Sequence, residues 1–325
     1  MSEPIIDPER EIVDPHHHLW RDFPIDDYLL ADLHGDTGSG HRVVQTVFVE
    51  CGACYRPDGP DHLTPIGETE FVAELATASE ATEGATIAGI VARADLRLPL
   101  DQLDEVLDAH EAAAGGRFRG IRHALSSAPD PSFLMIPGSA PPDLSSDPDF
   151  RRGVAHLGER GLTYDTWHYH HQMGDFVELA RAVPGATIVL DHFGTPLGVG
   201  PYEGKHDEIY RPWRDDINAA ADCPNVVAKL GGLAMPDNGF GWDPMAPPTS
   251  DEVAAAHSRW YHHTIESFGP ERCMFESNFP VDKFSMPYDV LVNAQKKMAQ
   301  RYTDAEQDHM WSGTARSVYG LPSPA

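Results

Sequence analysis

Short runs rich in β-branched residues recur along the chain, separated by longer stretches in which apolar positions repeat every three or four residues. The short runs, typical of buried strands, cover residues 11–16, 43–50, 86–94, 117–123, 162–167, 186–192, 225–232 and 272–277. The longer stretches, typical of amphipathic helices, cover residues 67–82, 100–113, 147–160, 174–183, 213–221, 250–267, 286–300 and 303–318. Thr249 with Glu252 and Thr303 with Glu306 have the spacing of capping boxes, which predicts that two helices begin there.

Strands that alternate with helices form parallel βα units, and eight such units close into a (β/α)8 TIM barrel. The alternative is a doubly wound sheet, which usually has fewer strands and often a glycine-rich first turn. No G-x-G-x-x-G follows the first predicted strand. We therefore predict an α/β protein with a single barrel domain over residues 1–325, whose barrel core covers about residues 11–320.

Four long irregular segments each follow a predicted strand: 51–66, 124–146, 193–212 and 231–249. In a barrel, the segments that follow strands lie on the catalytic face. Their proline, glycine and aromatic content favours ordered loops over a substrate rather than disordered linkers. We expect these loops to shape a binding site for a small molecule.

The chain is strongly acidic, with 24 basic and 51 acidic residues and a formal net charge of -27. Such a charge repels nucleic acid and anionic membranes, so we expect neither as a partner. Assembly into a homo-oligomer is compatible with this charge. The four cysteines, which include a single Cys51-x-x-Cys54 pair, indicate a reducing compartment rather than a disulfide framework or zinc finger. No targeting segment or 18-residue apolar run occurs, and we expect a cytoplasmic protein.

The first predicted strand ends in Asp14-Pro15-His16-His17-His18. Side chains at positions i and i+2 of a strand point the same way, so His16 and His18 can converge on one metal ion or water molecule. His17 should point to the other side. A surface tract that happens to hold three histidines is the alternative, but similar residues recur at the ends of later strands.

Ionisable or polar residues stand at the carboxyl end of nearly every predicted strand. They are Glu50, Arg122 and His123, then His168, His170 and Gln172, then Asp191, His192 and Lys229, and finally Glu276 and Asn278. Burying so many polar groups without partners is costly, which favours one shared polar site at the mouth of the barrel. Each residue also has a structural alternative: His192 bonded to Asp191, Lys229 paired with a carboxylate of the barrel, and Glu50 orienting an imidazole.

The segments VDPHHHLW, GIRHAL, IVLDHFGTP, NVVAKLGGL and RCMFESNFPVDK resemble the amidohydrolase superfamily. The resemblance is to the amidohydrolase-related branch that contains 2-pyrone-4,6-dicarboxylate lactonase and L-fuconolactonase, and it covers about residues 11–320. It implies a barrel hydrolase in which water attacks a carbonyl, with His16, His18 and His192 around the reacting centre. It also implies a divalent metal, with zinc expected, held by these histidines and His170. A metal-free site is the alternative, because the lactonase branch includes metal-independent members.

The sequence departs from the family after the eighth strand, where Asn278 replaces the usual aspartate. An amide accepts no proton at neutral pH, so Asn278 can position water but cannot be the general base. Glu276, Asp191, Glu50 or a neutral histidine could take that proton. Arg122 is the expected clamp for a substrate carboxylate, because its guanidinium matches that geometry. Glu50, His123 and Lys229 complete the predicted substrate-binding set.

These observations predict an enzyme that hydrolyses a lactone or carboxylic ester of a small organic acid with an activated water. A metal-dependent decarboxylase or an amide-cleaving amidohydrolase on the same scaffold is one alternative. A non-catalytic binding protein is another, and Asn278 favours it. The number of imidazoles at the predicted mouth disfavours it, since binding alone does not require them.

Overall fold

A computed structural model describes residues 3–23 and 25–323 and contains one eight-stranded parallel sheet. The strands are hydrogen-bonded in chain order, from β1 to β8. Their bounds are β1 Glu11–His17, β2 Arg42–Val49, β3 Thr86–Ala92, β4 Phe118–Arg122, β5 Thr163–Thr166, β6 Ile188–Leu190, β7 Val226–Leu230 and β8 Cys273–Phe275. The predicted (β/α)8 barrel is confirmed.

The barrel closes where the segment after β8 meets the end of β1. The amide of Asn278 donates to the carbonyl of His16 at 3.0 Å, and the amide of His18 donates to the carbonyl of Phe279 at 2.8 Å. Asp14 braces this seam, because its carboxylate accepts hydrogen bonds from the amide of Ser277 at 2.9 Å and from the hydroxyl of Tyr288 at 3.1 Å. Burial raises the pKa of Asp14 to about 6. The seam places the end of β1 directly beside the residues that follow β8.

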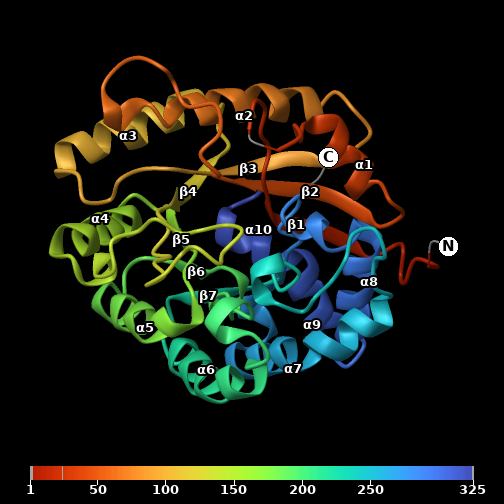
Figure 1. The fold of residues 1–325 in the computed structure, drawn as a ribbon. Coiled ribbons are helices and arrows are strands. Elements are labelled where there is room, and N and C mark those ends of the chain that lie inside the picture. The colour runs from red at the N-terminus through yellow and green to blue at the C-terminus, as the bar shows by residue number, and fades with distance from the viewer. Residues whose placement is uncertain (1–2, 24, 324–325) are drawn as a thin grey trace.

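Helices cover the outside of the strands, and the chain runs around the barrel in sequence order (Figure 1). Their bounds are α1 Leu30–Thr37, α2 Ile66–Ser79, α3 Leu100–Ala113, α4 Pro148–Glu159, α5 Met173–Ala182, α6 His206–Ala221, α7 Ser250–Phe268, α8 Tyr288–Ala299, α9 Asp304–Asp308 and α10 Thr314–Tyr319. A π-helical segment, His309–Gly313, joins α9 to α10. None of the described helices combines the length and the apolar character needed to cross a bilayer.

Both predicted capping boxes are present, at the starts of α7 and α9. Two helix predictions need correction. Helix α1 lies in a segment for which no helix is expected from the sequence, and α6 begins at His206 rather than at residue 213. The first two turns of α6 are mostly polar. Ile209, four residues before Trp213, is their one fully buried side chain, and Tyr210 packs half-buried beside it. Two adjacent apolar positions in two turns give no helical period, so the start of the helix is not revealed.

Two apolar layers stabilise the barrel. One lies between the strands and the surrounding helices, and the other fills the barrel with small residues such as Val13, Val47 and Val91. Helix α10 contributes Ala315 and Tyr319 to the inner layer. This packing leaves the carboxyl ends of the strands for polar residues.

Candidate active site

The histidines of β1 lie as the strand period predicts. His16 and His18 lie edge to face with ring centroids 4.9 Å apart, whereas the His17 ring contacts Thr46, with 3.0 Å between Nε2 and Oγ1. His18 Nδ1 is 2.7 Å from the carbonyl oxygen of Val49. A carbonyl can only accept, so Nδ1 carries the proton and Nε2 of His18 is the free acceptor. Burial and the charge of Arg122 hold the pKa of His18 well below its usual value, which keeps the ring neutral.

Glu276 links two of the predicted histidines. Its Oε1 lies 2.7 Å from Nδ1 of His192, and its Oε2 lies 3.0 Å from Nδ1 of His16. The rings of His16 and His192 are 4.5 Å apart. Burial favours the neutral acid, but the interactions with His192 and His16 outweigh it and lower the pKa of Glu276 to about 2. Glu276 is therefore an ionised carboxylate that fixes the Nδ1–H tautomer of His192.

A buried lysine lies beneath these histidines. Lys229 Nζ is 2.8 Å from Oδ2 of Asp165, 3.1 Å from Oδ1 of Asp191 and 3.2 Å from Nδ1 of His16. Tyr319 donates its hydroxyl to the same Asp165 oxygen at 2.5 Å. Burial disfavours the ammonium form, but the neighbouring carboxylates outweigh it and raise the pKa of Lys229. Because Lys229 is fully buried and is absent from the cavity lining, it supports the site from below.

Arg122 and Glu50 form a buried ion pair at the edge of the site. The guanidinium donates to Glu50 through Nε, at 2.9 Å to Oε1, and through a second nitrogen to the Glu50 carbonyl. Its remaining nitrogen lies 3.4 Å from Nε2 of His16 and 3.8 Å from Asp191. Two of the three guanidinium nitrogens are thus engaged by Glu50, which leaves one for other groups.

His16, Asp191 and His192 form a group that could hold a metal ion, with donor atoms within 4.8 Å of one another. Although Lys229 is close, neither oxygen of Asp191 accepts a well-aligned hydrogen bond from any residue of the described chain. Buried carboxylate oxygens without hydrogen bonds need an explanation, and a bound cation is one. Two imidazoles and one carboxylate are also a donor set that zinc uses. The residues therefore fit a divalent metal.

Three residues of the predicted site lie elsewhere. His123 Nδ1 accepts from the amide of Leu96 at 3.2 Å, and His170 Nδ1 accepts from the amide of Leu197 at 3.2 Å. His168 stacks on Phe176, with its Nε2 3.2 Å from the sulfur of Met173. None of the three belongs to the metal-binding group or the cavity lining found among the described residues. Gln172, also singled out in the sequence, caps its own turn and bonds the Leu125 carbonyl at 2.8 Å.

The amide of Asn278 is held by a carboxyl that sequence reasoning missed. Asn278 Nδ2 donates to Oδ1 of Asp282 at 2.8 Å, and the amide of Ala234 donates to Oδ2 of Asp282 at 3.2 Å. Burial raises the pKa of Asp282 to about 7. Asp282 lies in the quoted FESNFPVDK block, so the only available signal was an acidic residue four positions after Asn278. Asp165 was equally overlooked, since it lies in the middle of the run at 162–167.

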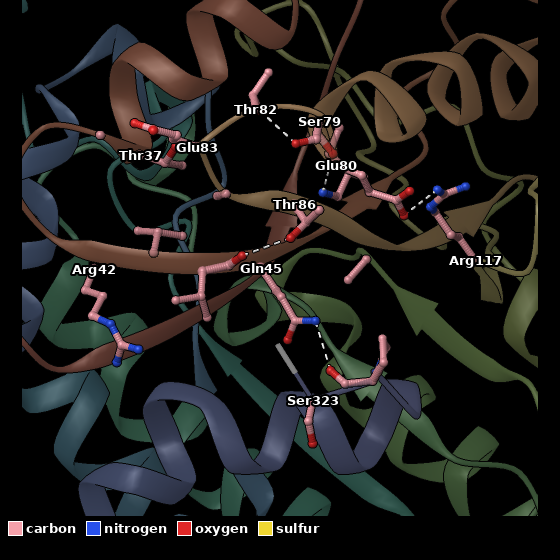
Figure 2. Close-up of a pocket in the computed structure, with 18 of the residues that line it drawn as sticks. Thr37, Arg42, Gln45, Ser79, Glu80, Thr82, Glu83, Thr86, Arg117 and Ser323 are labelled. Atoms are coloured by element: carbon pink, nitrogen blue, oxygen red, sulfur yellow. Dashed lines mark hydrogen bonds and ion pairs between the residues drawn. The ribbon is translucent and has the colours of Figure 1, made fainter. Parts of the chain in front are cut away.

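A cavity of about 450 Å³ opens over the histidines. Its polar lining residues are His18, Glu50, Arg122, His192 and Asn278. A larger cavity of about 830 Å³ lies at the opposite end of β2 and β3 (Figure 2). There Arg117 pairs with Glu80 at 2.6 Å, and none of the predicted site residues contributes to the lining. The carboxyl ends of the strands, where barrel enzymes carry out their chemistry, therefore hold the candidate site.

Comparisons with known proteins agree with this arrangement. The chain is 31% identical over 330 residues to the uncharacterized protein y4mH of Sinorhizobium fredii, covering 95% of this chain and 98% of that protein. It is 29% identical to an L-fucono-1,5-lactonase of Burkholderia multivorans, covering 96% and 97% of the two chains. The crystal structure of an amidohydrolase from Burkholderia multivorans with bound zinc superposes with a TM-score of 0.75 at 27% identity, covering 96% of this chain and all of that one. The family model described as Amidohydrolase matches residues 13–321, and the chain therefore belongs to the amidohydrolase family.

Proposed function

We propose that this protein hydrolyses a lactone or a carboxylic ester by the attack of water on the carbonyl carbon. The observation that carries the proposal is the pairing of His192 with Glu276, at 2.7 Å, on the wall of the cavity. Since Nδ1 of His192 donates to the carboxylate, Nε2 is a lone-pair acceptor. An imidazole oriented by an ionised carboxylate is a recurrent general base for acyl transfer.

The proposed reaction balances with these two residues. Nε2 of His192 takes a proton from water while the water oxygen bonds to the carbonyl carbon. The resulting tetrahedral intermediate collapses by breaking the bond from carbon to the ring or ester oxygen, and His192 returns its proton to that leaving oxygen. A lactone gives a hydroxy acid, and an ester gives an acid and an alcohol. Glu276 remains ionised and stabilises the imidazolium form of His192.

Arg122 is the proposed stabiliser of the negative oxygen in the intermediate. It lines the same cavity, and its third guanidinium nitrogen is not bonded to Glu50. A fixed cation in a water-poor site stabilises a developing oxyanion much more strongly than it would in water. This role replaces the substrate-carboxylate clamp predicted from the sequence, because Glu50 already occupies the fork of the guanidinium.

His16, Asp191 and His192 would hold a divalent cation, and zinc is the proposed ion because a related structure contains it. When bound, such an ion would polarise the carbonyl and lower the pKa of the attacking water. Nε2 of His192 would then be a ligand, so the proton transfer through His192 described above belongs to the metal-free site. In either state Glu276 keeps its task, which is to hold the imidazoles of His16 and His192 in place. Asn278 can orient the water through its amide oxygen.

The proposal is tested with a panel of lactones and aryl esters, measured by acid release. We expect turnover of at least one of them, and we expect His192→Gln to lower kcat/KM roughly 100-fold or more. His263→Gln, which changes a half-buried histidine of α7 that does not border the cavity, is the control and should leave kcat/KM unchanged. Circular dichroism of both variants verifies the fold.

Two results would overturn the proposal. One is a wild-type protein, tested with and without added zinc, that hydrolyses no lactone or ester faster than buffer. The other is full activity in His192→Gln. Carbon dioxide release from aromatic carboxylic acids, measured in parallel, would assign the site to decarboxylation instead.

A further inference from the structure

The cavity over the histidines divides into two chemical zones. The ends of the strands and the residues directly after them supply its charged and polar groups. The segments after the strands also supply an apolar wall, made of Trp20, Phe23, Ile25, Met135, Ile136, Pro137, Trp167, Met235, Val281 and Phe284. The segments that contribute to this wall follow β1, β4, β5, β7 and β8. A substrate that reaches His192 therefore also lies against hydrocarbon.

The two tryptophans in this wall have no free polar group to offer. The indole nitrogen of Trp20 donates to the carbonyl of Asp26 at 2.8 Å, and that of Trp167 donates to Oγ1 of Thr195 at 3.0 Å. Indole nitrogens only donate, so each of these is fully used. What Trp20 and Trp167 can present to a ligand is ring surface.

The rim of the cavity carries apolar side chains that face solvent. Four large apolar side chains are exposed in the described part of the chain: Ile25, Leu100, Met135 and Met245. Two of them, Ile25 at 38% and Met135 at 53% exposure, border this cavity. Exposed apolar groups gathered at the mouth of a site indicate an apolar ligand, whereas scattered ones do not.

The part of the wall that contains Met135 is fixed in place. The two carboxylate oxygens of Asp237, in the segment after β7, accept the amides of Met135 at 2.7 Å and of Ile136 at 2.9 Å. Asp237 is itself buried. A wall held by two charge-assisted hydrogen bonds loses little entropy when it receives a ligand.

We infer that the substrate is a lactone or ester that carries an alkyl or aryl substituent, and that a polyhydroxylated sugar lactone is a poor substrate. The inference rests on the proposed function. A sugar hydroxyl that lies against this wall would lose its water and would meet Trp20, Trp167 or methionine in place of a hydrogen-bond partner, which is unfavourable. An alkyl or aryl group would instead gain from burial against the same wall. The chain thus differs in expected specificity from its L-fucono-1,5-lactonase relative.

The test compares kcat/KM of the full-length protein for δ-decalactone, δ-valerolactone and L-fucono-1,5-lactone. We expect δ-decalactone to exceed the sugar lactone by about 100-fold and to exceed δ-valerolactone by about 10-fold. A sugar lactone that is hydrolysed as well as δ-decalactone would overturn this inference and leave the proposed hydrolase intact. The absence of any lactone hydrolysis would count against the hydrolase itself.

Binding tests the inference independently of turnover. The lactams 6-pentylpiperidin-2-one and piperidin-2-one have the ring shapes of δ-decalactone and δ-valerolactone but resist hydrolysis. By calorimetry we expect the pentyl compound to bind about 10-fold more tightly, because its chain is buried against the wall. Equal affinities would overturn the inference whatever the catalytic result.

A pair of methionine variants locates the effect. Met135→Ser should lower the preference for δ-decalactone over δ-valerolactone by about 5-fold. Met245→Ser is the matched control, because Met245 is 90% exposed and does not border the cavity, and this variant should leave the preference unchanged. An unchanged preference in Met135→Ser, or an equal change in both variants, would contradict the assignment of the wall.

Discussion

The side-chain amide of Asn278 donates a hydrogen bond of 2.8 Å to Oδ1 of Asp282, and both residues are buried. When Asp282 is ionised, its carboxylate can only accept hydrogen bonds, so the bond fixes the orientation of the amide. The amide oxygen, Oδ1 of Asn278, is then available at the cavity. A carboxyl is therefore present near the position where relatives are expected to carry aspartate. It holds the amide of Asn278 rather than facing the cavity itself.

An aspartate at position 278 should make stability depend more strongly on pH. In Asn278→Asp, two carboxyls would share a buried site with Asp282, whose pKa burial already raises to about 7. Raised pKa values mean that the folded protein binds more protons than the unfolded one, so stability falls as pH rises from about 4 to above 7. We expect the Tm loss relative to wild type to be larger at pH 8 than at pH 5, measured by thermal denaturation.

The control for this experiment is Asn218→Asp, which makes the same change on the exposed face of α6. It should shift Tm little and by the same amount at both pH values, because a surface charge is screened. If Asn278→Asp lost equal stability at pH 5 and pH 8, the buried pairing with Asp282 would not hold.

Metal binding should depend on Asp191. We expect zinc added to chelator-treated protein to raise Tm by about 3 °C or more, because a ligand that binds only the folded state stabilises it. Asp191→Asn should abolish that rise, since it removes the carboxylate from the group with His16 and His192. Asp207→Asn, on the surface of α6, should retain it. An identical rise in all three proteins would place the ion elsewhere.

The fold was accessible from the sequence because its strands are short, β-branched and bounded by turn-forming residues. All eight runs coincide with strands of the barrel. Helix α1 was missed since its eight residues bury only Leu33 and Thr37, which is too few positions to form a period. The π-helical segment between α9 and α10 was missed for a different reason, because its hydrogen bonding leaves no mark on hydrophobic periodicity.

The site was accessible only in part. Strand period and strand ends bring His16, His18, His192 and Glu276 to one place, and they do lie together. Residues beyond the end of a strand follow the path of a loop, which hydrophobic periodicity does not describe. His170 was therefore expected beside His16 and His18, whereas its ring accepts a hydrogen bond from the amide of Leu197. Such contacts between loops depend on tertiary packing and not on local spacing.

Asp237 should control the loop at 124–146. Asp237→Ala removes both hydrogen bonds to the amides of Met135 and Ile136, at a cost of about 1.5–3 kcal/mol for each bond to a charged group. We expect faster proteolytic cleavage within 124–146 and a higher KM for δ-decalactone. Asp237→Asn, which keeps one acceptor, should give an intermediate result.

The matched control for Asp237 is Asp243→Ala, which removes an exposed carboxylate that bonds the amide of Met245 at 2.9 Å within its own turn. Its cleavage pattern and KM should match those of wild type. Unchanged cleavage of the 124–146 loop in Asp237→Ala would show that other contacts hold the wall.

Glu68 should make the protein less stable as the medium becomes more alkaline. This buried residue of α2 accepts the amides of Cys51 at 3.0 Å and Ala53 at 2.8 Å, and so holds the segment directly after Glu50. Burial, together with the charge of Glu50, raises the pKa of Glu68 to about 8 from an ordinary value near 4.5. Because the folded state keeps the proton over this range, the stability contribution of Glu68 is present below about pH 4.5 and is lost as pH rises toward 8.

Glu68→Gln should remove this dependence while keeping an oxygen that accepts both amides. We expect Tm of the variant relative to wild type to be higher at pH 8.5 than at pH 5, measured by differential scanning fluorimetry. The control is Glu70→Gln, two residues further along the same helix and exposed. A hydrogen bond from Arg56 lowers the pKa of Glu70, so the loss of the Glu70 carboxylate should bring no gain in Tm at high pH. If the Tm difference between Glu68→Gln and wild type were the same at both pH values, Glu68 would be ionised in the folded protein throughout this range. The amides of Cys51 and Ala53 would then bond to a carboxylate rather than to a neutral acid.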